Sequence, residues 1–259
     1  MELISLNTLS ASLLSAIVWN LVTWFFGIPS SSSHALIGGL MGAAFASSGM
    51  DAINLAGLWK VLLALFAFPL AGFFIGFLLL KLIYFLAKNA SPSINNFFKR
   101  SQLITSIALA LGHGTNDAQK PIGIITLSLI ISGVLSDFSV PFWVIFVSAL
   151  TMALGASLGG WRLIRTLGGK FYKIRPVHSF ATQLTSGFAI LYASILGLPI
   201  STLQVVSSAI VGVGASERIG KVRWSVAGDI LTAWIITIPV SALVSAGIYS
   251  ALNFFGVRL

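Results

Sequence analysis

Residues 112–121 read GHGTNDAQKP. Apolar segments lie on both sides of them, at 103–111 and 122–134. An ionisable side chain at the depth of the bilayer costs roughly 2.5–3.5 kcal/mol on insertion scales, and such residues usually mark functional sites. Irregular backbone survives at that depth only where it is buried in protein or lines a wet cavity. We therefore expect residues 112–121 to break the crossing formed by 103–134 and to line a polar site.

Asn116 and Asp117 are the predicted ligands of that site. Asn116 is a favourable N-cap, and Pro121 is tolerated in the first turns of a helix, so a half-helix is expected from Asp117 onward. The N-terminus of such a helix carries free N–H groups and partial positive charge, which suits an anion. The alternative is a structural ion pair, because Asp117 and Lys120 are spaced i,i+3.

The composition indicates a membrane protein. The chain is 57% hydrophobic and only 8% charged, whereas a soluble domain carries about 25% charged residues. It contains no cysteine, which excludes disulfides and thiolate metal sites. We expect an all-α, polytopic protein of the plasma or inner membrane, in contact with the lipid bilayer, that is not an enzyme.

The net charge of +9 could suggest nucleic acid, but the positions of the cations argue against such a partner. They gather at 88–100, 160–176 and 216–224, between apolar segments, which is the positive-inside pattern. These three stretches are therefore predicted to be cytoplasmic. The turns that contain Asp51 and Asp137 carry no cation and are predicted to lie outside.

An internal repeat links GIPSSS at 27–32 to GLPIST at 197–202, an offset of 170 residues that also aligns Gly42 with Gly212. The charge pattern makes the two copies run in opposite directions, which predicts an inverted repeat with discontinuous helices, as in secondary transporters. We expect a first repeat at 1–87, a cytoplasmic linker at 88–100 and a second repeat at 101–259.

Hydroxyl groups follow the proline in both copies of this repeated motif. Ser31, Ser32, Ser201 and Thr202 can donate to the oxygens of an anion, together with the N–H groups of the helices that follow. The alternative is close helix packing, because small residues are common where membrane helices meet. The three histidines, His34, His113 and His178, are expected to be structural or gating groups, with proton or substrate binding as the alternative.

These motifs resemble those of the PiT family of inorganic phosphate transporters. HGTNDA at 113–118 is similar to the family's G-A-N-D-x-A-N signature, and 27–34 and 197–202 are similar to its G-L-P-V-S-T-T-H element. The resemblance implies a phosphate symporter driven by Na⁺ or H⁺, with no cofactor beyond the coupling cation. It also implies that Ser31, Ser32, Asn116, Asp117, Ser201 and Thr202 bind the substrate, and that Asp117 and Asn116 also hold the cation. The assembly state stays open, with a homodimer among the alternatives.

Family members carry two Asn-Asp motifs, and this chain carries only the second. A shift of Asp117 back by 170 residues falls before Met1, so we expect the N-terminal part with the first Asn-Asp motif to be missing. Three further departures are Lys120 in place of Asn, Leu203-Gln204 in place of Thr-His, and Gln183 in place of Glu. The alternative functions are a permease for sulfate or another oxyanion, an anion channel, and a truncated remnant that does not transport.

Overall fold

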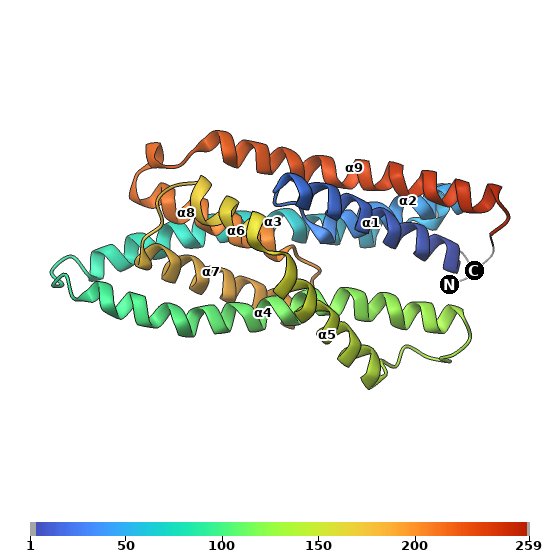
Figure 1. Cartoon of the computed structure of the whole chain (residues 1–259), viewed down its shortest axis with the longest axis horizontal. Helices are drawn as coiled ribbons and strands as arrows, with labels where there is room; N and C mark the ends of the chain where they lie inside the picture. Colours follow the sequence, from blue (N-terminus) through green and yellow to red (C-terminus); the bar gives the residue numbers. More distant parts are fainter. Residues whose placement is uncertain (1–3, 258–259) are drawn as a thin grey trace. The chain divides into compact units, whose positions relative to one another are not determined.

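The computed structural model describes residues 4–257, apart from the side chain of Arg162, and every regular element in this range is helical (Figure 1). The elements are α1 (Leu6–Phe26), α2 (Ser32–Ser48), η1 (Gly49–Ala52), α3 (Leu55–Leu86), α4 (Ile94–Ile131), α5 (Phe142–Gly159), α6 (Trp161–Arg165), η2 (Thr166–Lys170), α7 (Pro176–Ile195), α8 (Thr202–Glu217), η3 (Ile219–Lys221) and α9 (Trp224–Phe254). Four of the described helices, α1, α3, α5 and α9, are long and apolar enough to cross a bilayer. The all-α membrane class is confirmed.

Helix boundaries repeat with the offset that separates Gly27 from Gly197. The starts of α1 and α7 correspond under this offset, as do those of α2 and α8. The long helices α3 and α9 follow at matching positions, and each contains a proline, Pro69 and Pro239, at the same place in the repeat. The predicted repeat is therefore visible as two series of three helices. Their opposite orientation in the membrane stays a prediction.

Both copies of the repeated motif end one helix and begin another. Gly27 has a left-handed backbone with φ of 67°, and its N–H reaches the carbonyls of the last turn of α1. Gly197 has a φ of 64° at the end of α7. Glycine adopts this conformation without the steric cost that a Cβ atom brings, so it commonly terminates helices. The helix that follows then packs against the one before it, giving two hairpins, α1–α2 and α7–α8.

The predicted break at 112–121 is wrong, because α4 runs through it as one helix of 38 residues. Within residues 4–257 no position of α4 has a positive φ, so its glycines permit a break without enforcing one. The hydroxyl of Thr115 donates to the carbonyl of Leu111, one turn earlier in the same helix. Pro121 lies inside the helix; neighbouring helices can accommodate such a proline in a membrane protein. Asn116 is consequently not an N-cap.

The described chain divides into two compact units, which we name after their hairpins. The α1–α2 unit runs up to Lys60 and adds Ala118–Gly159 and the chain from Leu231. The α7–α8 unit comprises Val61–Asp117 and Gly160–Ile230. These units alternate along the sequence, and the division into repeats around residues 88–100 stays a prediction.

Each hairpin lies closely against a long proline-containing helix of its own unit. A Cβ atom added to Gly42 of α2 would collide with the backbone of Ala242 in α9, and one added to Gly212 of α8 would collide with the backbone of Phe73 in α3. The repeat aligns these two glycines, and their lack of a side chain lets the helix backbones touch. Small residues in the repeat thus serve helix packing, as expected at membrane interfaces.

Candidate substrate and coupling site

Asp117 and Thr202 connect α4 to the first residue of α8 within the α7–α8 unit. The hydroxyl of Thr202 donates to Oδ2 of Asp117 at 2.8 Å. The Thr202 residue is 4% exposed and the Asp117 side chain 19% exposed. The structure therefore brings together two of the residues predicted to bind the substrate, one from each of two separate motifs.

His113 reaches the same carboxylate oxygen from one turn earlier in α4. Its Nδ1 lies 3.0 Å from Oδ2 of Asp117, at the i,i+4 spacing of a helix. An ionised carboxylate only accepts hydrogen bonds, so both Thr202 and His113 act as donors to it. A continuous α4 makes this pair available, because a break at Asn116 would have separated the two side chains.

Asn116 points to a different neighbour, helix α7. Its side-chain nitrogen donates to Oγ of Ser194 at 3.3 Å, and the Ser194 hydroxyl donates to the carbonyl of Ile190 at 2.9 Å. Asn116 is 1% exposed. This amide therefore joins α4 to α7 in the structure, and its role as a substrate or cation ligand stays a prediction.

Ser201 and Ser31 occupy matching positions in the two copies of the motif but make different contacts. Ser31 caps α2 by accepting from the backbone N–H of His34 at 3.1 Å. Ser201 is the N-cap residue of α8, yet its side chain makes no capping bond. Both are buried, whereas Ser32, the first residue of α2, is exposed. Ser31 and Ser32 belong to the α1–α2 unit, so an anion site shared by both motif copies stays a prediction.

A cavity of about 420 Å³ lies inside the α7–α8 unit, beside the contacts of Asp117 with Thr202 and His113. His113 of α4 and Thr202 of α8 form part of its wall. Most of the remaining lining is apolar and comes from α4, α6, η2, α7 and α8: Ser106, Leu109, Ala110, Ile164, Leu167, Ile190, Leu203 and Val206. Within this lining, as the structure describes it, His113 is the only titratable side chain.

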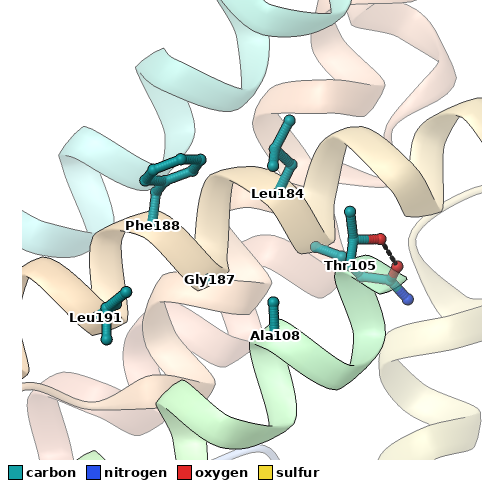
Figure 2. Close-up of a pocket in the computed structure, with 7 residues that line it drawn as sticks. Thr105, Ala108, Leu184, Gly187, Phe188 and Leu191 are labelled. Atoms are coloured by element: carbon teal, nitrogen blue, oxygen red, sulfur yellow. Dashed lines mark hydrogen bonds between the residues drawn. The ribbon is translucent and has the colours of Figure 1, made fainter. Parts of the chain in front are cut away.

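Gln183 lies at a second, smaller cavity of about 110 Å³ between α4 and α7 (Figure 2). Thr105 donates to the side-chain oxygen of Gln183 at 2.6 Å, at one end of the cavity. The rest of the wall is formed by Ala108, Leu184, Gly187, Phe188 and Leu191. This almost entirely apolar lining suits hydrocarbon rather than an anion.

Glu217 organises a polar cluster that we did not expect from the sequence. Its carboxylate contacts Arg175, accepts from Nζ of Lys221 at 2.7 Å, and lies 2.9 Å from Nε2 of the buried His178. Arg175 also donates to the hydroxyl of Tyr84 at 3.1 Å. Burial raises the pKa of Glu217, but Lys221, His178 and Arg175 together hold it below its ordinary value. The one feature of the sequence that could have indicated this cluster is that Glu217 is the single acidic residue within the basic stretch 216–224.

Comparison with known proteins decides the family. Residues 2–96 and 86–245 match the profile described as Phosphate transporter family. The chain belongs to this family. It is 46% identical over 245 residues to a protein of Bacillus subtilis (strain 168) described as "Probable low-affinity inorganic phosphate transporter", covering 94% of this chain and 74% of that protein. A protein of Rhizobium meliloti (strain 1021) with the same description is 44% identical over 243 residues, 93% of this chain and 73% of its own length.

A relative from Mycobacterium leprae (strain TN), again with that description, is 39% identical and extends further than this chain, which covers 63% of it. A solved structure described as "The sodium-dependent phosphate transporter" superposes with a TM-score of 0.86 at 23% identity, covering 96% of this chain and 80% of that one. At this identity the likeness shows the fold. Membership of the family, together with the apolar helices, makes the chain a multi-pass protein of the cell membrane.

Proposed function

We propose that this chain carries inorganic phosphate across the membrane as a secondary symporter that binds its coupling cation beside Asp117. The hydrogen bond from Thr202 to Asp117 carries the proposal, because it sets a carboxylate against the first turn of α8. Close relatives described as low-affinity inorganic phosphate transporters support phosphate as the substrate.

The first turn of α8 supplies donors for an anion. Backbone N–H groups in the first turn of a helix have no intrahelical partner and carry partial positive charge. The hydroxyl of Ser201 stands at the same place and does not cap the helix. Phosphate is recognised here by N–H and O–H donors, in the way that helix N-termini bind anions elsewhere.

The charge of Asp117 explains why a cation has to accompany the anion. Two like unit charges 4 Å apart repel by about 4 kcal/mol at an effective dielectric constant of 20. A cation bound beside Asp117 removes this repulsion, so the cation and phosphate favour each other's binding. Such reciprocal coupling is what a symporter requires. Asn116, one residue earlier, is the second proposed cation ligand.

Uptake into proteoliposomes that contain the purified chain tests this function. We expect phosphate to accumulate against its gradient when a cation gradient is applied, and arsenate, a close isostere, to compete. Asp117→Asn should fold normally and lose cation-driven accumulation. Sulfate uptake without competition by phosphate would instead identify a sulfate permease, and uptake that stops at equilibrium under every cation gradient would identify a channel.

A further inference from the structure

We propose that the C-terminal end of α8 and the η3 turn bind the phosphate group of an anionic phospholipid, with Arg218 and Lys221 as its ligands. The inference goes beyond the proposed transport and does not depend on it. The observation that carries it is a polar cavity of about 510 Å³, whose wall is formed by Glu217, Arg218, Gly220 and Lys221.

This cavity is separate from the candidate substrate site. Helix α8 begins at Thr202, beside Asp117, and ends at Glu217 in the cavity wall. A helix of its 16 residues spans about 24 Å. An anion held by Arg218 is therefore not the anion proposed to bind near Asp117, and its binding can be measured on its own.

Two basic stretches of the sequence are held together next to the cavity. The backbone N–H of Arg223 donates to the carbonyl of Phe171 at 3.1 Å. Glu217, in the same stretch as Arg223, contacts Arg175 in the stretch of Phe171. Between residues 170 and 230 the chain has six lysines and arginines but only two acidic residues. The fold therefore gathers an excess of positive charge around the cavity.

Glu217 does not neutralise the cavity wall, because its carboxylate is already engaged. It contacts Arg175 and accepts a hydrogen bond from Lys221 at 2.7 Å. The side chain of Arg218 is exposed and makes no hydrogen bond or ion pair with any residue that the structure describes. A guanidinium presents its N–H groups in a fork that fits phosphate oxygens. The ammonium group of Lys221 has three donors, so it has donors left for the same phosphate.

The neighbours of these cations indicate a lipid rather than a dissolved anion. Ile219 lies between them in the sequence and is 66% exposed. The indole of Trp224 donates to the carbonyl of Ile219 at 3.0 Å, and Trp224 begins α9, a candidate membrane span. Tryptophan is typical of the boundary between hydrocarbon and water, and basic residues next to a span attract anionic headgroups. A phospholipid would place its phosphate at the cations and its acyl chains along Ile219 and Trp224.

Thermal unfolding of the full chain in detergent tests this binding. The midpoint is measured against the concentration of a short-chain phosphatidylglycerol, and of the phosphatidylcholine with the same acyl chains. A ligand that binds only the folded chain raises the midpoint as its concentration rises above its Kd. We expect phosphatidylglycerol to act at a concentration at least fivefold lower than phosphatidylcholine. Equal effects of the two lipids would overturn the inference.

Arg218→Gln is the decisive variant, because it removes one ligand and leaves the contacts of Glu217 in place. Loss of one cation beside the membrane should weaken the binding of phosphatidylglycerol about fivefold. The midpoint without lipid should not change. Arg100→Gln is the matched control, since it removes the same charge from an exposed position of α4. It should bind phosphatidylglycerol like the unmodified chain. Equal losses in both variants would show an effect of net charge alone and would overturn the inference.

Inorganic phosphate distinguishes a lipid from a dissolved anion. If phosphate stabilises the chain through the candidate substrate site, Arg218→Gln should be stabilised as much as the unmodified chain. A stabilisation by inorganic phosphate that depends on Arg218 would assign the cavity to the dissolved anion and overturn the lipid.

Native mass spectrometry then identifies the lipid directly. From an equal mixture of the two lipids, the unmodified chain and Arg100→Gln should retain phosphatidylglycerol in preference to phosphatidylcholine, and Arg218→Gln should lose this preference. The same preference in all three proteins would place the bound lipid elsewhere and overturn the inference.

Discussion

The imidazole of His178 donates from Nε2 to the carboxylate of Glu217, 2.9 Å away, and thereby joins the first turn of α7 to the last residue of α8. The backbone N–H of Arg175 donates to Nδ1 of the same ring at 3.1 Å, so Nε2 is the nitrogen that carries the hydrogen. The two outer ends of the α7–α8 hairpin are thus tied together. The aligned positions in the α1–α2 hairpin are Thr8 and Ser47, which carry no charge, so this clamp belongs to one repeat only.

Replacement of Glu217 by glutamine should loosen the clamp. The variant leaves Arg175, Lys221 and His178 without their shared carboxylate. Because the Glu217 side chain is 23% exposed, solvent compensates for part of the loss, and we expect destabilisation of about 1–2 kcal/mol. Thermal unfolding in detergent should show a midpoint lower by about 2–8 °C. Asp137→Asn, in an exposed turn, is the control. Equal midpoints for both variants would contradict a stabilising clamp.

The clamp also predicts a loss of stability in acid. Burial raises the pKa of Glu217, but its three partners lower it by more, so the pKa in the folded chain lies below the ordinary value of 4.5. A group with a lowered folded pKa stabilises the protein above its unfolded pKa, and that contribution disappears as the pH falls through the folded value. Between pH 7 and pH 4 the unfolding midpoint of the unmodified chain should fall more than that of Glu217→Gln. Parallel pH profiles would show that this carboxylate is not coupled to folding.

Thr202→Val tests the donor that joins α8 to Asp117. The valine keeps the shape of the side chain and removes the hydroxyl, so the carboxylate loses a hydrogen bond worth about 1–2 kcal/mol. We expect phosphate affinity to fall about 5–30-fold with the chain still folded. Ser207→Ala on the same helix is the matched control, because the Ser207 hydroxyl bonds the carbonyl of Leu203 within α8. Equal affinities for the two variants would remove Thr202 from the site.

Gly212→Ala tests the close approach of α8 to α3. The added methyl group would collide with the backbone of Phe73, and backbone cannot move aside as a side chain can. We expect destabilisation of about 1–3 kcal/mol, the usual cost of overpacking. Gly247→Ala in α9 is the control, because apart from the adjoining backbone of α9 itself no described atom lies within 4 Å of the position of its new Cβ atom. At position 247 the higher helix propensity of alanine should increase the free energy of unfolding by about 1 kcal/mol at most. A neutral Gly212→Ala would contradict the packing.

Cysteine labelling tests the orientation predicted from charge. The chain has no native cysteine, so a single introduced thiol reports its own position. Ser136 and Gly168 are both exposed. An impermeant thiol reagent added to intact cells should label Ser136→Cys and not Gly168→Cys. The reverse pattern would invert the assignment of the basic stretches to the cytoplasm.

Several features followed from the sequence because they depend on local chemistry. A composition this apolar requires helices wherever backbone groups meet lipid. Gly27 and Gly197 end helices because glycine tolerates the left-handed backbone that a hairpin needs. The offset between these two glycines predicted where α2 and α8 begin, and the family motif predicts a substrate site at Asp117.

Tertiary structure alone decided how the polar side chains are used. Residues 112–121 have the local features of a helix break, yet α4 continues, and Asn116 and Asp117 find their partners, Ser194 and Thr202, on α7 and α8. The contacts of Glu217 with Arg175 and His178 likewise join residues about 40 positions apart. A buried polar group requires a partner wherever the fold supplies one, and the sequence around it does not contain that partner's position.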